Sequence, residues 1–282
     1  MYKKVNNDNN NRIIYYYQTF CGLSTILIKN TPVTHIHLSS IHFGTTKNKT
    51  PYIHLNDNLP DDKIFDSVWY DLKIASQLGI KIVLMIGGTG GAYQALFSDF
   101  NTYYPMLKKV INEHPIITGI DLDIEEQVDI NNVKMLISKL HMDFGNNFII
   151  SMTPIQGALA YDSPGLGGFI YKDLYNSPEG KLITYFNSQF YGNFSYNSYQ
   201  QVINNGYPQE KIVIGMLSSQ FTSNSFINAL EEIVKIKNKY PNFAGVYDWE
   251  FWNAQPCSID PSQWSKLIKD AMNLDNKGCS IM

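Results

Sequence analysis

Arginine, cysteine and long apolar runs are scarce in this 282-residue sequence, and each scarcity excludes a class of protein. Arg12 is the only arginine, so the chain lacks the guanidinium clusters with which proteins clamp phosphate or carboxylate groups. Cys21, Cys257 and Cys279 are odd in number and far apart, which predicts no disulfide framework. No run of eighteen apolar residues occurs, and we therefore expect no membrane-spanning helix.

The charge balance also excludes partners. A net charge of −3 and a pI near 6.1 give no basis for binding nucleic acid or an anionic membrane surface. The chain starts with MYKKVNNDNNNRIIYYY, which is charged and asparagine-rich where a signal peptide needs an apolar segment. The sequence therefore predicts a soluble monomer that is cytoplasmic or exported by a non-classical route.

Short apolar segments alternate with segments of helical spacing along most of the chain. This alternation, over about the length that one α/β barrel needs, predicts a single (β/α)8 TIM barrel at 12–275. We expect a disordered polar tail at 1–11 and a C-terminal tail at 276–282. A long excursion interrupted by glycine and proline runs from 155 to 180. The expected strands are 12–20, 33–44, 81–88, 116–125, 148–154, 182–192, 211–217 and 243–252, and the expected helices are 61–78, a stretch within 89–114, 131–145, 199–205, 226–240 and 260–272.

The fourth expected strand carries three acids at alternate positions. Asp121, Asp123 and Glu125 lie at i, i+2 and i+4, so all three project from one face of an extended strand. Neighbouring Cβ atoms in such a row are about 6.6–7 Å apart, so the three are not expected to be ionised together. A stored carboxylic proton beside a carboxylate is typical of a general acid and points to glycoside hydrolysis. The alternatives are a solvated edge strand and a Ca²⁺ or Mg²⁺ site.

Other polar and aromatic residues are expected at the same end of the barrel. Glu125 ends the fourth strand, Gln189 and Tyr191 end the sixth, and Trp249 ends the eighth. Because active sites of such barrels lie at the carboxyl ends of the strands, these side chains are expected to converge.

With these residues placed, the sequence resembles glycoside hydrolase family 18, the chitinases and endo-β-N-acetylglucosaminidases, over 12–275. The family's fourth strand carries DxxDxDxE, of which the D-x-D-x-E portion is present in the acidic row. Its SxGG pattern is matched in part by 85–88, its QFY by 189–191, and its tryptophan floor by Trp249. Two positions depart from the pattern: Thr118 replaces the first aspartate and Met85 the serine, which in the family lie deeper in the barrel and help to hold the charges.

The resemblance implies retaining, substrate-assisted, endo-acting hydrolysis of β-1,4 bonds next to N-acetylglucosamine, in chitin or chitooligosaccharides. It implies Glu125 as the acid, Asp123 as the group that orients the acetamido nitrogen, Asp121 as the partner sharing its proton, and Tyr191 as donor to the acetamido oxygen. No cofactor and no metal is implied. The interval 217–243 is too short for the α+β insertion domain of some chitinases, so an open groove is expected. We assign substrate contacts to Trp249, Gln189, Gly87, Gly88, Met152 and Tyr15, and candidate sugar platforms to Tyr161, Phe169, Tyr171 and Tyr175.

Several alternatives remain open at this stage. The substrate could instead be the core of an N-glycan, or the barrel could bind carbohydrate with little turnover. His35 and His37 on one strand face are the pattern of a metal-dependent barrel hydrolase, for which core histidines are the simpler explanation. If the family assignment holds, activity should survive exhaustive chelation, whereas a loss restored by zinc would favour the two histidines. The glycines at 87–91 could cradle a phosphate, although a tight turn explains them as well.

Overall fold

The computed structural model describes residues 11–274. The predicted tails at 1–11 and 276–282 therefore lie outside the described residues, except for Asn11. Asn11 is buried, and its side-chain amide donates a hydrogen bond to the Phe243 carbonyl. The barrel therefore already includes this residue, which was predicted to belong to the tail.

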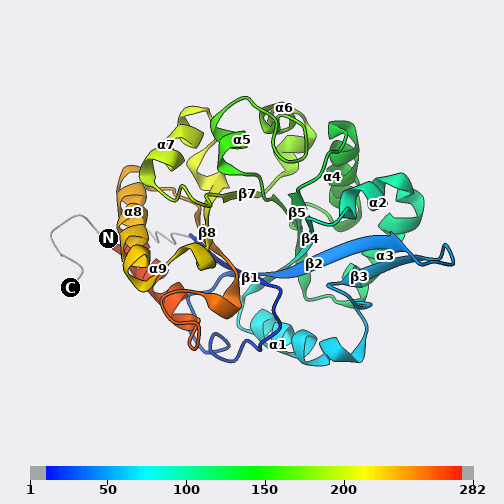
Figure 1. Ribbon diagram of the computed structural model, residues 1–282, viewed down its shortest axis with the longest axis horizontal. Helices are drawn as coiled ribbons and strands as arrows, with labels where there is room; N and C mark the ends of the chain where they lie inside the picture. The colour runs from blue at the N-terminus through cyan, green and yellow to red at the C-terminus, as the bar shows by residue number, and fades with distance from the viewer. Residues whose placement is uncertain (1–10, 275–282) are drawn as a thin grey trace, which may run out of the picture.

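Among residues 11–274 the sheet contains nine strands, of which all but β3 run parallel and close into a barrel. Pairing of β1 with both β2 and β9 completes the ring. Figure 1 shows this ring with the helices arranged around it. The (β/α)8 prediction is confirmed. The strands are β1 (Arg12–Tyr17), β2 (His35–Thr45), β3 (Pro51–Leu55), β4 (Lys81–Gly88), β5 (Ile117–Ile124), β6 (Ile149–Met152), β7 (Tyr185–Gln189), β8 (Ile212–Leu217) and β9 (Gly245–Trp249).

Helices cover the outside of the barrel and follow the predicted order. Residues 218–244, all of them described, hold one 3₁₀ turn and one helix, so no α+β domain separates β8 from β9. The long excursion after β6 contains two short helices. The helices are α1 (Asp66–Gln77), α2 (Ala92–Ser98), α3 (Phe100–Glu113), α4 (Ile130–Phe144), α5 (Gln156–Ala160), α6 (Tyr171–Asn176), α7 (Tyr196–Asn204), α8 (Ser223–Lys239) and α9 (Ser262–Asn273), and the 3₁₀ turns are Lys63–Phe65, Glu179–Leu182, Gln209–Lys211, Ser218–Gln220 and Phe251–Asn253.

Strand β3 was not predicted, because its surroundings are rich in lysine, asparagine and threonine and resemble a loop. It pairs antiparallel with the end of β2, with Ile41 opposite Leu55 and Thr45 opposite Pro51. Proline is tolerated there because it is the first residue of an edge strand. The hairpin extends beyond the ring of strands (Figure 1), so it adds a wall at one side of the barrel mouth.

The single helical stretch predicted within 89–114 is divided in two. Asp99 breaks it with a non-helical backbone, φ −147° and ψ 73°, and its carboxylate accepts the Thr102 N–H at the start of α3. A short polar side chain that bonds to its own downstream backbone favours such a cap over helix continuation. The helix predicted to be capped by Asp260 begins at Ser262, and Asp260 still accepts the Ser262 N–H.

Strand alternation divides the buried side chains into two sets. One apolar set lies between the barrel and the helices. A second set fills the barrel itself, and includes Ile14, Tyr16, Met85, Tyr185 and Tyr247. Because side chains on a strand alternate in direction, a residue's parity decides whether it reaches the helices or the barrel axis.

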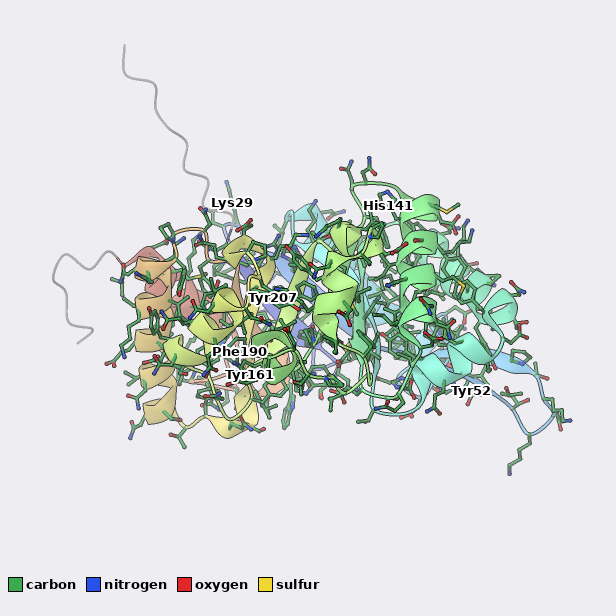
Figure 2. All side chains as sticks on the ribbon, turned by 90° about the horizontal axis from the view of Figure 1, so that it is seen from above. Lys29, Tyr52, His141, Tyr161, Phe190 and Tyr207 are labelled. Atoms are coloured by element: carbon green, nitrogen blue, oxygen red, sulfur yellow. The ribbon has the colours of Figure 1, made fainter. Side chains whose placement is uncertain are left out.

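The two ends of the barrel lie on opposite sides of the molecule. Figure 2 shows Lys29 and His141 near one edge and Tyr52 and Tyr161 toward the other. Lys29 and His141 precede strands β2 and β6, whereas Tyr161 follows β6 and α5. The second edge is therefore the carboxyl end of the strands, where a barrel active site is expected. Within residues 11–274 no helix combines the length and the apolarity needed to cross a membrane.

Candidate active site

The acidic row lies where the alternation predicted it. Strand β5 points Asp121 and Asp123 into the barrel, where both are buried, and Glu125 follows at its carboxyl end, half-buried. The intervening residues Ile120, Leu122 and Ile124 pack in the outer apolar layer. Because β5 is paired with β4 on one side and β6 on the other, the alternative of a solvated edge strand is wrong.

Asp121 is surrounded by donors. Its Oδ2 accepts hydrogen bonds from Tyr16 Oη at 2.6 Å and Thr153 Oγ1 at 2.8 Å, and its Oδ1 accepts one from Ser151 Oγ at 2.6 Å. His37 Nδ1 lies 3.3 Å from Oδ2. Burial by itself raises the pKa of the Asp121 carboxyl, but His37 and the hydroxyl donors outweigh burial, so the pKa lies below its ordinary value. Asp121 is thus a buried anion.

Asp123 has the opposite balance. Burial, followed by the negative charges of Glu125 and Asp121, raises the pKa of Asp123 well above its ordinary value. The Gln189 amide opposes this only in part. Of the two buried acids, Asp123 therefore holds a proton more readily than Asp121.

Gln189, the last residue of β7, contacts both Asp123 and Glu125. Its Nε2 lies 3.3 Å from Asp123 Oδ1 and 3.1 Å from Glu125 Oε1, and it also lies 3.2 Å from the Thr153 carbonyl oxygen. A single amide thus contacts both carboxyl groups, which fixes their separation.

Two glycines let β4 approach β5 closely. Gly87 and Gly88 have φ values of 94° and 74°, in the left-handed region. A Cβ on Gly87 would lie 2.3 Å from the Asp123 carbonyl oxygen, so no side chain fits there.

At the start of α2, Glu126 Oε1 accepts the Tyr93 N–H at 2.5 Å and the Gln94 N–H at 3.3 Å. This carboxylate occupies the place at which a phosphate would bind a helix N-terminus, and it anchors the loop that carries Glu125.

A cavity of about 270 Å³ opens above the row. Tyr191 and Trp249 form part of its wall, and the Tyr191 hydroxyl accepts a hydrogen bond from Tyr247 at 3.2 Å. A second cavity of about 580 Å³ adjoins the first and extends along the β2–β3 hairpin. Both are lined by Gln18, Ser40 and His42; the first is also lined by Met85, Gly87, Gly88, Thr89, Asp123, Glu125, Thr153, Gln189, Tyr191, Leu217 and Trp249.

Two predicted substrate contacts are wrong, for the same reason. Tyr15 is fully buried in the outer layer, where its hydroxyl donates to the Pro261 carbonyl at 2.5 Å. Met152 is fully buried in that layer too. In each case the neighbouring residue faces the barrel interior: Tyr16 beside Tyr15, and Ser151 and Thr153 beside Met152.

Tyr15 and Tyr16 face opposite sides of β1, so substituting each in turn tests which of them serves the active site. Tyr16→Phe should lower kcat about tenfold, because Asp121 loses a hydrogen bond to a charged group. Tyr15→Phe should lower the free energy of unfolding by about 1 kcal/mol with kcat unchanged. Urea denaturation and steady-state kinetics on both variants measure this, and a kcat loss confined to Tyr15→Phe would reverse the assignment.

The two histidines of β2 have protein partners. His37 Nε2 lies 3.1 Å from the Tyr185 hydroxyl, and His35 Nδ1 lies 2.8 Å from Thr34 Oγ1. Within residues 11–274 no three His, Cys, Asp or Glu side chains are grouped so as to hold a metal ion. The metallohydrolase and Ca²⁺ or Mg²⁺ alternatives thus have no ligand set in the described part of the chain.

Thr118 and Met85, the two residues that depart from the family pattern, make other hydrogen bonds. Thr118 donates to the Ile82 carbonyl at 3.1 Å, at the start of β5. Met85 lies inside the barrel, and its sulfur accepts the Ser39 hydroxyl at 3.0 Å. The charge of Asp121 is instead balanced by Tyr16, Ser151 and Thr153, which carry no motif signal, and by His37, which the sequence suggested only as a possible metal ligand.

The predicted sugar platforms differ in exposure. Tyr161 is 56% exposed and lies toward the carboxyl side of the barrel (Figure 2). Phe169 and Tyr171 are buried and contact each other, with ring centroids 4.8 Å apart, and Tyr175 packs against Phe186. Phe169, Tyr171 and Tyr175 therefore pack within the excursion or against β7, and Tyr161 remains the candidate platform.

No protein-family model and no curated protein matches this sequence. Solved structures do. A fungal endo-β-N-acetylglucosaminidase from glycosyl hydrolase family 18 is 29% identical, with 93% of this chain and 98% of that chain covered and a TM-score of 0.83. A chitinase from Aspergillus fumigatus is 28% identical, with 93% and 100% covered and a TM-score of 0.78. A family 18 chitinase from Pseudoalteromonas aurantia, at 20% identity and a TM-score of 0.71, shares the fold over 92% of this chain and 99% of its own.

The likeness spans nearly the whole barrel and includes two enzymes above one identical residue in four. It agrees with three features of the site: the acidic row on β5, the close approach of β4 to β5 at Gly87 and Gly88, and the cavity with Trp249 in its wall. The chain thus resembles glycoside hydrolase family 18 over nearly its whole length and is a chitinase-like glycoside hydrolase.

Proposed function

We propose that this enzyme hydrolyses β-1,4 bonds next to N-acetylglucosamine with retention of configuration. The observation that carries this proposal is the position of Glu125, which lines the open cavity above the buried Asp123 and is linked to it by Gln189. A carboxyl group at the cavity wall is placed to donate a proton to a bound substrate. The likeness to family 18 enzymes supports the substrate class.

In the first step, Glu125 enters as the carboxylic acid, with a proton taken from the solvent of the open cavity that it lines. It donates that proton to the glycosidic oxygen, and the bond from that oxygen to the anomeric carbon breaks. The carbonyl oxygen of the substrate's own acetamido group forms the new bond to that carbon, which gives an oxazolinium ion. As the acetamido group binds, Asp123 passes its proton to Asp121. The Asp123 carboxylate then orients the acetamido nitrogen and stabilises its growing positive charge, and the Tyr191 hydroxyl donates to the acetamido oxygen. Trp249 forms the floor beneath the sugar.

In the second step, water attacks the anomeric carbon and the oxazolinium ring opens. The Glu125 carboxylate takes a proton from that water and is restored as the acid. Two inversions at one carbon give net retention. This is substrate assistance, which differs from the scheme of two protein carboxylates.

Two substrates fit the site, and each has support. Chitin oligosaccharides agree with the chitinase to which the chain is similar, and N-glycan cores agree with the endo-β-N-acetylglucosaminidase. The second cavity, running along the hairpin past Tyr52 and His54, offers room for sugars beyond the cleavage site. We place chitooligosaccharides first and the N-glycan core second; a barrel that only binds carbohydrate is disfavoured because Glu125 is intact.

A reducing-sugar assay on soluble chitin oligosaccharides and on a high-mannose glycopeptide tests the proposal. Turnover of either substrate is expected, and the ratio of the two rates identifies the preferred one. Binding of both sugars without release of reducing ends would contradict hydrolysis.

The open cleft predicts how a long polymer is cut. With no α+β domain between β8 and β9 to wall the groove, the enzyme should act in an endo, non-processive manner. Mixed oligomers should appear early from a soluble chitin polymer, as resolved by chromatography of the products over time. A product mixture dominated from the outset by the disaccharide would indicate a closed groove.

A further inference from the structure

We propose that His37 is a positioning residue for this reaction: its Nδ1–H holds Asp121 as an anion and thereby keeps the proton of the row on Asp123. The inference rests on the proposed function, because it explains how the acidic row is set for that chemistry. It assigns to a barrel histidine the task that the family pattern gives to the positions of Thr118 and Met85.

The geometry around His37 supports this role. The imidazole lies inside the barrel with both partners of the pair fully buried, and Nδ1 is 3.3 Å from Asp121 Oδ2. On the opposite side of the ring, Nε2 is 3.1 Å from the Tyr185 hydroxyl. Tyr16, opposite His37 in the β1–β2 register, packs its ring 4.8 Å from the imidazole and donates to the same Asp121 oxygen.

The ring can donate toward Asp121 in two charge states. Both the imidazolium and the Nδ1–H neutral tautomer carry a proton on Nδ1. The Tyr185 hydroxyl accepts from Nε2 in the first state and donates to it in the second, so it satisfies either. The Asn187 amide lies 3.4 Å from Nδ1 and donates to Tyr16 at 2.8 Å, completing the contacts on that side.

The other titratable groups facing this region do not replace the Nδ1–H. Burial lowers the pKa of His35 well below its ordinary value, and the charge of Arg12 adds to this, so His35 is neutral. The Arg12 guanidinium is held over the Tyr185 ring, 4.3 Å from its centroid. Burial raises the pKa of Tyr16 and Tyr185, so both remain neutral donors.

The effect reaches the reacting carboxyls through Asp121. An anionic Asp121 is one cause of the raised pKa of Asp123. Loss of the Nδ1–H would let Asp121 take up a proton at higher pH, and two protonated aspartates would leave no anion to draw the proton from Asp123 when the acetamido group binds. Loss of the Asp121 anion would stop the reaction. The fall of kcat at low pH, the acidic limb of its pH profile, should therefore follow the pKa of Asp121.

Two substitutions of His37 separate positioning from packing. In His37→Asn the side-chain N–H lies near the place of Nδ1, whereas in His37→Gln it lies near the place of Nε2. The pH dependence of kcat should show His37→Asn within about threefold of the parent, with the acidic limb unmoved. His37→Gln should lower kcat about tenfold and move the acidic limb about one unit to higher pH, as expected for a lost hydrogen bond to a charged group. KM should change little, since His37 does not line the cleft.

A purely structural role predicts a different result. Both variants would then lose kcat and thermal stability alike, with the acidic limb in its original place, and that outcome would overturn the inference. Should His37→Gln not fold, His37→Leu offers the same comparison without a donor. Tyr185→Phe is the control on the other side of the ring, and should leave the acidic limb in place.

A measurement without turnover separates this inference from the proposed function. Titration of the Asp121 carboxyl carbon by ¹³C NMR, assigned with Asp121→Asn, should give a higher midpoint in His37→Gln than in the parent or in His37→Asn. Equal midpoints in all three would overturn the inference even if hydrolysis is confirmed. A higher midpoint in His37→Gln in a protein that cleaves no sugar would instead refute the proposed function alone.

Discussion

Replacing Glu125 with glutamine is expected to lower kcat by about 10²- to 10⁴-fold, the usual contribution of a positioned general acid. The amide keeps the size of the side chain and can still contact Gln189, which lies 3.1 Å from Glu125 Oε1, but it cannot supply a proton to the glycosidic oxygen. Sugar binding should remain measurable, because the walls at Trp249 and Tyr191 are unchanged. Steady-state kinetics and calorimetric titration of a chitin oligosaccharide measure the two effects separately.

The matched control is Glu113→Gln. Glu113 belongs to α3 and forms an exposed pair with Lys109, 3.7 Å apart, so its substitution removes the same charge far from the cleft. Parent-like kinetics are expected for it. Equal rates for Glu125→Gln and the parent would remove Glu125 from the mechanism.

Substrates with a free amine in place of the acetamido group at the cleavage-site sugar should be hydrolysed at least about 10³-fold more slowly. The amine has no carbonyl oxygen to attack the anomeric carbon, so the reaction loses a nucleophile held within bonding distance, an advantage that can reach several kcal/mol. Initial rates on fully acetylated and fully deacetylated oligomers of equal length measure this effect.

A thiazoline analogue of the oxazolinium intermediate provides the companion test. It should inhibit competitively, since it has the ring that the site is proposed to stabilise. Rapid cleavage of the deacetylated oligomer, with no inhibition by the thiazoline, would show that a protein carboxylate or a water molecule attacks instead.

Local sequence patterns predicted the barrel well. The alternation in ITGIDLDIEE predicted which side of β5 carries acids, and the eight barrel strands were found because buried parallel strands form short apolar runs. Strand β3 was missed because Tyr52 and His54 alternate with Ile53 and Leu55 over only five residues. Its pairing with β2 depends on a partner strand and not on local composition.

The site was predicted where motif residues lie at strand ends, and missed inside the barrel. Glu125, Gln189, Tyr191 and Trp249 line one cavity, as expected from their positions. In RIIYYY, three tyrosines in succession do not show which of them points into the barrel. The sequence therefore suggests Tyr15 as a substrate contact, whereas Tyr16 is the residue that contacts Asp121. Only the register between strands fixes which tyrosine faces the axis.

Retaining hydrolysis assisted by the substrate fixes the configuration of the newly formed product. A ¹H NMR time course on a soluble chitin oligosaccharide, recorded faster than the reducing end mutarotates, distinguishes the two anomers. With retention, the β anomer forms first and the α anomer appears only as mutarotation proceeds. Formation of the α anomer first would mean a single inversion at the anomeric carbon, and would contradict the proposed mechanism.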